Sequence, residues 1–183
     1  FGEILDTLRA YHGSGAEAVF NLSASPWTWR KTDKRSRVVR GILRRAPLPF
    51  FYVNHVGAQN NGKNVIVFDG DTTVYGSDGG AVLRARPWRE QLVLSTEATA
   101  VPAPPRHVAS VYEAVLTGLR HLDNVRGRRN RYLIGVSGGV DSSVVACLLT
   151  QALGPERVCA VNMPTSFNAA VTQRNAQDLC ARL

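Results

Sequence analysis

The residues with the clearest capacity for chemistry lie in the stretch SGGVDSS, Ser137–Ser143. The apolar run YLIGV before it is typical of a strand, and VVACLLTQALG after it is typical of a buried helix. Two glycines at a strand-to-helix turn let the main chain approach a ligand with no Cβ in the way. The N–H groups that open a helix, together with its dipole, stabilise negative charge. This order of residue types predicts a phosphate-binding loop.

The polar side chains of the same stretch refine that prediction. The hydroxyls of Ser137, Ser142 and Ser143 can donate hydrogen bonds to a phosphate. The Asp141 carboxylate would repel phosphate unless a cation lay between them, so we interpret it as a contact for Mg²⁺. The stretch has neither G-x-x-x-x-G-K-[ST] nor G-x-G-x-x-G. A glycine-rich helix start without a ligand is the alternative interpretation.

A second candidate site lies in NLSASPWTWRK. Ser25 follows an apolar strand pattern, and Lys31 comes six positions later at the head of a basic helix. The edge of a strand and the start of the next helix can converge on one small ligand. A hydroxyl and an ammonium group there would suit a carboxylate. The alternatives are a helix N-cap for Ser25 and a solvated base for Lys31.

The elements that must position these residues form a mixed α and β pattern. After a helix with apolar residues at 108–122, we expect a strand at 132–136, a helix at 144–153, a strand at 158–162 and a helix from about Asn168. This alternation favours a doubly wound parallel sheet, whose ligands bind at the carboxyl ends of the strands.

The upstream half predicts different elements. We expect a helix ending in LDTLRAYHGSG, a strand in AEAVFNLSAS, a basic amphipathic helix at Arg30–Arg45, one buried strand in FFYVNHVGAQ, and a hairpin in NVIVFDGDTTVYGSDGGAVLRA that turns at Asp-Gly. Prolines among small residues in TEATAVPAPPRH predict a linker at 98–106, between a domain at 1–97 and a domain at 107–183.

The composition is that of an ordinary globular protein, with 44% hydrophobic residues and a net charge of +8. More than half of the 22 basic residues fall in Arg30–Arg45 and Arg126–Arg131. We interpret them as solvated surface; a basic nucleic-acid-binding module is the alternative, although no aromatic residues alternate with them. No apolar run approaches the roughly 20 residues that span a bilayer, so we expect a cytoplasmic protein.

The cysteines and histidines suggest no metal site by their spacing. Cys147, Cys159 and Cys180 lie among apolar neighbours, which predicts buried, reduced thiols. The chain begins at Phe1, has Met163 as its one methionine, and ends in a helical pattern. We therefore expect an internal fragment of a longer protein.

The loop SGGVDSS resembles the pyrophosphate loop of the ATP pyrophosphatase enzymes, which adenylate a substrate and release pyrophosphate. RVCAVNMPTSFNAAVTQRNAQDLCARL is similar to the second strand and loop of the NAD synthetases in that group. NLSASPW with Lys31, and FYVNHVGAQ followed by VFDGD, resemble the nitrilase-type glutaminase domain of the glutamine-dependent members. Another amidating or thiolating enzyme of the same loop family is the alternative.

This resemblance implies a glutamine-hydrolysing NAD⁺ synthetase, with part of an α-β-β-α nitrilase-like domain joined to the start of the synthetase domain. Such an enzyme adenylates deamido-NAD with ATP and Mg²⁺ and amidates it with ammonia from glutamine, giving NAD, AMP and pyrophosphate; the full-length protein would be a homo-oligomer. The resemblance implies glutamine binding by Ser25 and Lys31, a metal contact at Asp141, and ATP binding by Gly135, Val136, Ser137, Gly138, Gly139, Val140, Asp141 and Ser142.

The sequence also departs from the family pattern. No cysteine precedes Cys147, so the resemblance implies a glutaminase triad upstream of Phe1. His55 stands where the family has glutamine, and the segment at Asn60–Asn64 is longer. The contacts to deamido-NAD would follow Leu183.

Overall fold

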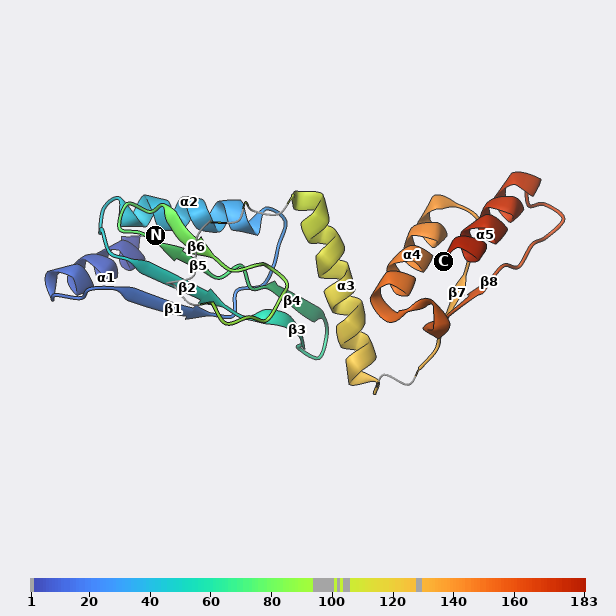
Figure 1. Ribbon diagram of the computed structural model, residues 1–183, viewed down its shortest axis with the longest axis horizontal. Coiled ribbons are helices and arrows are strands. Elements are labelled where there is room, and N and C mark those ends of the chain that lie inside the picture. The colour runs from blue at the N-terminus through green and yellow to red at the C-terminus, as the bar shows by residue number, and fades with distance from the viewer. Residues whose placement is uncertain (1, 94–100, 102, 104–105, 128–129) are drawn as a thin grey trace. The chain divides into compact units, whose positions relative to one another are not determined.

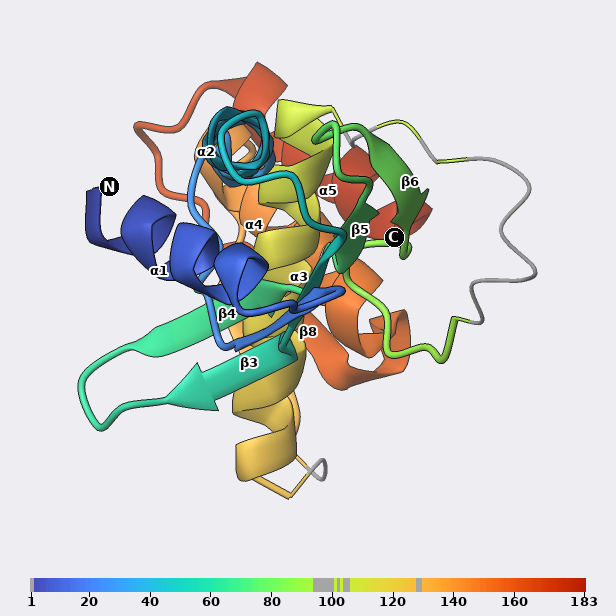
Figure 2. The same cartoon turned by 90° about the vertical axis from the view of Figure 1, so that its left-hand side faces the viewer.

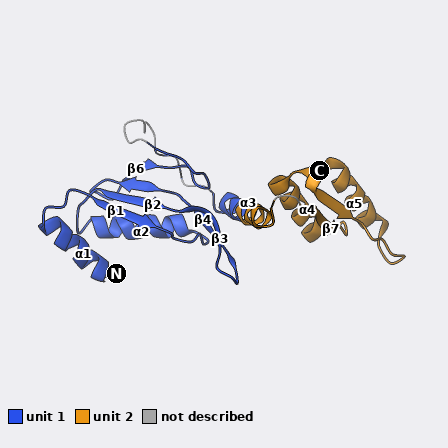
Figure 3. Ribbon diagram, turned by 90° about the horizontal axis from the view of Figure 1, so that it is seen from below, with its two compact units in different colours: residues 1–114 blue, residues 115–183 orange. Residues whose placement is uncertain are grey.

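The computed structural model describes residues 2–93, 101, 103, 106–127 and 130–183 (Figure 1). The chain divides into two compact units, residues 1–114 and 115–183, and the division falls inside helix α3 (His107–Val125) (Figure 3). The expected linker at 98–106 lies mostly outside the described residues, which include only 101, 103 and 106 of it. None of the described helices is long and apolar enough to cross a membrane.

Unit 1 is built around a four-stranded sheet in the order β1-β2-β5-β6. Strand β1 pairs with β2 in parallel, and the other two pairings are antiparallel. Strands β3 and β4 form a separate antiparallel hairpin (Figure 2). The elements are α1 (Gly2–Gly13), β1 (Val19–Ser23), α2 (Lys31–Leu43), β2 (Phe50–Asn54), β3 (Val56–Asn60), β4 (Val65–Asp69), β5 (Thr73–Tyr75) and β6 (Ala81–Arg84).

Helix α2 covers one face of this sheet. Its Val39 and Leu43 pack against Tyr52 and Tyr75 in a buried cluster. Helix α1 extends the core, because Leu5 and Leu8 pack with Ile42 and Ala46. The amphipathic basic helix predicted from the sequence is confirmed. One of its arginines differs: Arg35 is only 8% exposed, since two buried aspartates neutralise it.

The opposite face of the sheet is apolar and exposed. Side chains alternate between the faces of a strand, so Phe20, Leu22, Phe51 and Val53 lie opposite to Tyr52. Phe20 and Leu22 are 66% and 79% exposed. The rings of Phe20 and Phe51 stack with their centroids 4.4 Å apart. Few soluble surfaces carry so many neighbouring apolar side chains.

One prediction about strands in this unit was wrong in detail, and another is confirmed. FFYVNHVGAQ is two strands in different sheets, because the chain leaves β1 after Asn54 and joins β4 from Val56. The Asp69-Gly70 pair connects β4 to β5 through left-handed Gly70 and Asp71 and forms no hairpin. The predicted hairpin that turns at Asp-Gly is confirmed at Asp78-Gly79, between β5 and β6, where a Cβ on Gly79 would lie 2.9 Å from the Cα of Arg40.

Unit 2 contains a strand–helix–strand–helix order. Strands β7 and β8 pair in parallel, with Tyr132 beside Val158 and Gly135 beside Val161. Val136, Ala146 and Ala176 form the buried cluster. This mixed α/β arrangement confirms the alternation expected from the sequence. Its elements are β7 (Tyr132–Gly135), α4 (Val140–Leu153), the 3₁₀ turn η2 (Pro155–Arg157), β8 (Val158–Val161) and α5 (Ala170–Arg182).

The prediction of buried thiols was wrong, because Cys147, Cys159 and Cys180 are all free and exposed. The helices pack on the side of the sheet that carries Ile134 and Val136. Cys159 is the register partner of Leu133, which is 74% exposed on the other side. A thiol among apolar neighbours in sequence is therefore uncovered here, since the described two-stranded sheet is covered on one side.

Candidate functional site

The glycine-rich loop connects β7 to α4 as the sequence predicted, but the helix begins earlier. Strand β7 ends at Gly135, and α4 starts at Val140 rather than at Val144. Asp141, Ser142 and Ser143 therefore belong to the first turn of the helix. The first N–H groups of a helix have no carbonyl partner inside it. The carboxylate and hydroxyls thus lie at the end of the helix that favours anions.

Gly138 is required at its position for two reasons. Its φ of +83° lies in the left-handed region that side chains disfavour. A Cβ there would also collide with the backbone carbonyl of Thr172, just after the start of α5. The glycine thus lets α5 approach the loop closely, in addition to any role toward a ligand.

The serine hydroxyls of the loop stabilise the loop itself. The Ser137 and Ser142 Oγ atoms lie 3.1 Å apart, and the Gly139 N–H donates to Ser137 Oγ at 3.2 Å. Ser142 and Ser143 both donate to the Gly139 carbonyl, at 3.2 and 2.8 Å. We expected these hydroxyls to serve a ligand; in the structure they hold the turn in a defined shape.

A pocket of about 280 Å³ opens beside the loop. Asn162, directly after β8, donates from Nδ2 to the Val136 carbonyl at 2.6 Å and so connects the two strand ends. Sequence reasoning missed Asn162, although a polar residue immediately after a strand is a usable signal for the carboxyl edge of a parallel sheet. The pocket is lined by Gly135, Val136, Ser137, Val161, Asn162, Met163, Pro164, Asn168 and Gln173.

Asp141 is exposed in the first turn of α4. No hydrogen bond or ion pair engages its carboxylate among the described residues, which leaves it available to a cation. The described part of the chain has no group of three or more His, Cys, Asp or Glu that could hold a metal ion. One carboxylate with hydroxyls nearby fits Mg²⁺, which is usually bound by one or two carboxylates plus phosphate oxygens and water.

The second candidate site lies in unit 1, where Ser25 and Lys31 occupy different surroundings. The Ser25 N–H donates to Asn54 Oδ1 at 2.8 Å. Lys31 begins α2, as predicted, and lines a pocket whose other members are Trp27, Arg30, Thr32, Asp33, Arg106, His107 and Ser110. Ser25 does not line this pocket, and no hydrogen bond joins it to Lys31 in the described structure. The two predicted residues are thus near each other in sequence but do not line one pocket among the described residues.

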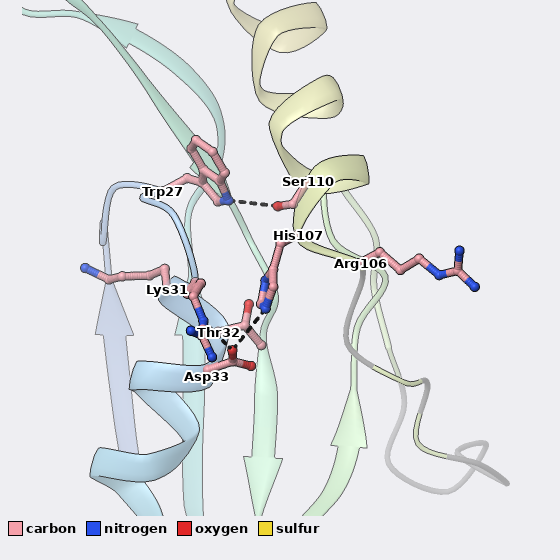
Figure 4. Close-up of a pocket in the computed structure, with 8 residues that line it drawn as sticks. Trp27, Lys31, Thr32, Asp33, Arg106, His107 and Ser110 are labelled. Carbon is pink, nitrogen blue, oxygen red and sulfur yellow. Dashed lines mark hydrogen bonds and ion pairs between the residues drawn. The ribbon is translucent and has the colours of Figure 1, made fainter.

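The pocket at Lys31 is held together by contacts to the start of α3 (Figure 4). The Trp27 Nε1–H donates to Ser110 Oγ at 2.8 Å, and His107 Nε2 lies 3.3 Å from Asp33 Oδ2. Figure 4 shows the Lys31 side chain turned away from the Asp33–His107 pair. Within the described residues its ammonium group has no hydrogen bond or ion pair, so it is available to a carboxylate.

A buried ionic cluster beneath this region was not predicted from the sequence. Arg35 Nη1 lies 3.0 Å from Asp71 Oδ2, and its Nη2 lies 3.4 Å from Asp69 Oδ1. Arg84 Nε approaches Asp71 Oδ1 at 3.4 Å. Burial raises the pKa of the Asp71 carboxyl, and the guanidinium groups of Arg84 and Arg35 oppose that rise. The charges compensate one another, as buried charges must.

Comparison with known proteins finds relatives that match nearly the whole chain. Residues 112–183 match the family model described as NAD synthase. The chain is 30% identical to a glutamine-dependent NAD(+) synthetase of Rhodobacter capsulatus, over 97% of this chain and 33% of that protein. The chain is a relative of the glutamine-dependent NAD(+) synthetases. A second member of this family, from Synechocystis, is 30% identical over 92% of this chain and 31% of its own length.

The fold agrees with solved glutamine-dependent NAD+ synthetases. The structure from Acinetobacter baumannii, in complex with adenosine diphosphate, matches with a TM-score of 0.85 at 24% identity, over 97% of this chain and 34% of that one. The structure from Cytophaga hutchinsonii matches with a TM-score of 0.70 at 18% identity, over 93% of this chain and 35% of that one. The chain spans about a third of the length of these NAD(+) synthetase relatives.

Proposed function

We propose that this chain is part of an enzyme that converts deamido-NAD to NAD with ATP and with ammonia taken from glutamine. The observation that carries the proposal is the loop Gly135–Ser142 at the carboxyl end of a parallel strand. This loop lies inside the region that matches the NAD synthase model. The relatives that match nearly the whole chain are named as glutamine-dependent NAD(+) synthetases. The activity, its substrates and its products are proposals for this chain.

The loop and the first turn of α4 would bind the phosphates of ATP, through Gly135, Val136, Ser137, Gly138, Gly139, Val140, Asp141 and Ser142. A solved relative binds adenosine diphosphate, which supports a nucleotide at this fold. Asp141 would hold Mg²⁺, and this cation would shield the phosphate charge. No lysine follows the glycines to reach a terminal phosphate. We therefore propose adenylation with release of pyrophosphate, after which ammonia displaces AMP.

Glutamine would bind in unit 1, at Ser25 and Lys31. The ammonium group of Lys31, which pairs with no described residue, suits the glutamine carboxylate, and the Ser25 hydroxyl can hydrogen-bond to the same α-amino-acid group. The three cysteines of this chain all belong to unit 2. We therefore propose that the glutaminase nucleophile and its partners lie outside these 183 residues, as do the contacts to deamido-NAD.

The finer architecture is proposed on the same basis. Residues 1–97 would be part of a nitrilase-like α-β-β-α domain, and residues 107–183 the start of a doubly wound parallel sheet. The exposed apolar face with Phe20 and Leu22 supports the first assignment, because an α-β-β-α sandwich needs a second sheet on that face. We propose that the full-length protein is a cytoplasmic homo-oligomer.

A second candidate function is binding of a polyanion such as nucleic acid. Arg37, Arg40 and Arg44 line a groove along α2, and none of them makes an ion pair with a described residue. Binding of tRNA that weakens steeply with added salt would support this function, because neutralised phosphates release counterions. Absent or salt-independent binding would exclude it.

The products of ATP turnover test the leading proposal. In the full-length protein, NAD formation should release AMP and pyrophosphate in equal amounts, which ion-exchange chromatography separates from ADP. Asp141→Asn should abolish most Mg²⁺-dependent turnover while the folded state persists. Asp178→Asn, on the exposed surface of α5, is the matched control. Release of ADP and phosphate would overturn the assignment of this loop.

A further inference from the structure

Asn54, the last residue of β2, makes three hydrogen bonds with its side-chain carboxamide although only 8% of the residue is exposed. Its Oδ1 accepts from the Ser25 N–H at 2.8 Å. Its Nδ2 donates to the Ser25 carbonyl at 3.3 Å and to Asp69 Oδ1 at 3.4 Å. One side chain therefore holds both backbone polar groups of Ser25.

Ser25 needs such a partner because the parallel pairing of β1 with β2 ends at Ser23 beside Asn54. Beyond that point the backbone of Ser25 leaves the sheet, and its N–H and C=O lose the partners that a continuing strand would supply. The carboxamide has the same donor and acceptor as a peptide group. The Asn54 carboxamide thus adds one further donor and acceptor at the end of the β1–β2 hydrogen-bond ladder. It fixes the position at which Ser25 leaves the sheet.

The Asn54 carboxamide cannot exchange the positions of its Oδ1 and Nδ2 atoms without losing hydrogen bonds. Asp69 is buried and pairs with Arg35, so its carboxylate oxygen accepts hydrogen bonds and donates none. Nδ2 must therefore face Asp69, which leaves Oδ1 facing the Ser25 N–H. The orientation of one amide is set by a buried ion pair rather than by solvent.

The same ion pair extends toward the other proposed glutamine residue. Arg35 also pairs with Asp71, whose Oδ2 accepts from Thr32 Oγ1 at 2.9 Å. Thr32 directly follows Lys31 in the first turn of α2. A continuous buried network therefore runs from the backbone of Ser25 to the residue beside Lys31.

We propose that Asn54 is a positioning residue for glutamine: it holds the backbone of Ser25 in the place from which Ser25, together with Lys31, would bind the substrate. This inference rests on the proposed function, in which Ser25 and Lys31 bind glutamine. Asn54 itself need not touch the substrate. Its contribution should appear in the KM for glutamine and should not appear when ammonia is supplied directly.

Two substitutions separate the contributions of the carboxamide. Asn54→Ala leaves both backbone groups of Ser25 without a partner. Asn54→Asp keeps the size and the acceptor, but removes the donor and places a second carboxylate against Asp69 and the Ser25 carbonyl. We expect the KM for glutamine to rise about tenfold or more in both variants, since a lost buried hydrogen bond has about this effect. The aspartate variant should be affected at least as strongly as the alanine variant.

The experiment uses the full-length enzyme and measures NAD formation with glutamine and, separately, with ammonium chloride. Asn60→Ala is the control, because Asn60 also accepts a backbone N–H, that of Gly62, but in the exposed β3–β4 turn. If Asn54→Ala does not fold, the equal-sized Asn54→Asp carries the test. Hydrogen exchange at the Ser25 amide, measured by mass spectrometry, should accelerate in each folded variant.

The outcomes distinguish the positioning proposal from the proposed function. A raised KM for glutamine with unchanged ammonia-dependent kinetics supports the inference. An unchanged KM for glutamine, or a parallel loss of both activities, overturns it and leaves the proposed function standing. A wild-type enzyme that forms NAD from ammonia but never from glutamine overturns the proposed glutamine site and this inference together.

Discussion

Arg157 and Asp123 form a two-pronged ion pair, with Nη1 and Nη2 of the guanidinium 2.7 and 2.5 Å from the two carboxylate oxygens. Asp123 lies near the end of α3, and Arg157 ends the turn before β8. Tyr132, which starts β7, donates to Asp123 Oδ1 at 3.1 Å. One buried carboxylate thus joins α3, the start of β7 and the turn before β8, and it sets the position of β7 below the glycine-rich loop.

Removing the charge of Asp123 should destabilise unit 2. Asp123→Asn cannot pair with both guanidinium nitrogens, and it leaves Arg157 without the carboxylate of its ion pair. We expect a lower midpoint of thermal unfolding, measured by circular dichroism. The midpoint should decrease less for Arg157→Lys, which keeps the positive charge but lacks the two parallel N–H donors of the guanidinium group. Asp178→Asn should have no effect. Equal midpoints for Asp123→Asn and Asp178→Asn would show that the pair contributes nothing.

Gly138→Ala should lower the free energy of unfolding more than the same substitution at a positive-φ glycine that has no neighbouring atoms. A non-glycine residue at this positive φ costs about 1–3 kcal/mol in free energy of unfolding. The collision with the Thr172 carbonyl adds to that cost. Gly62→Ala is the matched control, because Gly62 has a φ of +89° and no atom near its ideal Cβ. If urea denaturation gave the same decrease in free energy of unfolding for Gly138→Ala and Gly62→Ala, the contact between α5 and the loop would contribute nothing.

Lys31→Ala should separate the two nitrogen sources. A charged hydrogen bond is worth about 1.5–3 kcal/mol, so its loss should weaken glutamine use by roughly ten- to a hundredfold. NAD formation from ammonia should stay nearly unchanged in the full-length enzyme. Lys34→Ala, an exposed lysine of the same helix, provides the control. If both activities fell together, Lys31 would be a structural residue.

The buried carboxyl of Asp71 predicts a pH dependence of stability. Its pKa is raised by burial above the ordinary value of 3.8, so the folded state binds this proton more readily than the unfolded state does. The free energy of unfolding should therefore fall as the pH rises from about 3.8 through the raised pKa. Asp71→Asn removes this titration, and the stability of the wild type relative to the variant should decline over that interval. A flat difference between the wild type and Asp71→Asn over that interval would contradict the assignment.

The sequence predicted the elements best where one local pattern determines them. The loop between β7 and α4 follows from glycines between two apolar runs, and α2 follows from the helical spacing of Val39, Ile42 and Leu43. The break at His55 did not follow, because β2 and β3 differ in pairing partners and not in residue type. A strand that changes sheets is determined by contacts with distant segments.

The candidate site was predictable to the same extent. Ser137, Gly138 and Asp141 were selected as candidates by their order along the chain. Asn54 and Asp71 were not, because their partners Ser25 and Thr32 lie 29 and 39 residues away in sequence. Buried polar networks depend on such distant pairings, and no local periodicity marks them.

Unit 1 has one apolar side and one positively charged side. One face of its sheet presents Phe20 and Leu22, while α2 and its C-cap residue on the other face present Arg37, Arg40 and Arg44. A purified sample of these 183 residues should therefore bind a phenyl resin at high salt and a sulfonate resin at low salt. Its handling calls for intermediate ionic strength, where neither attraction dominates.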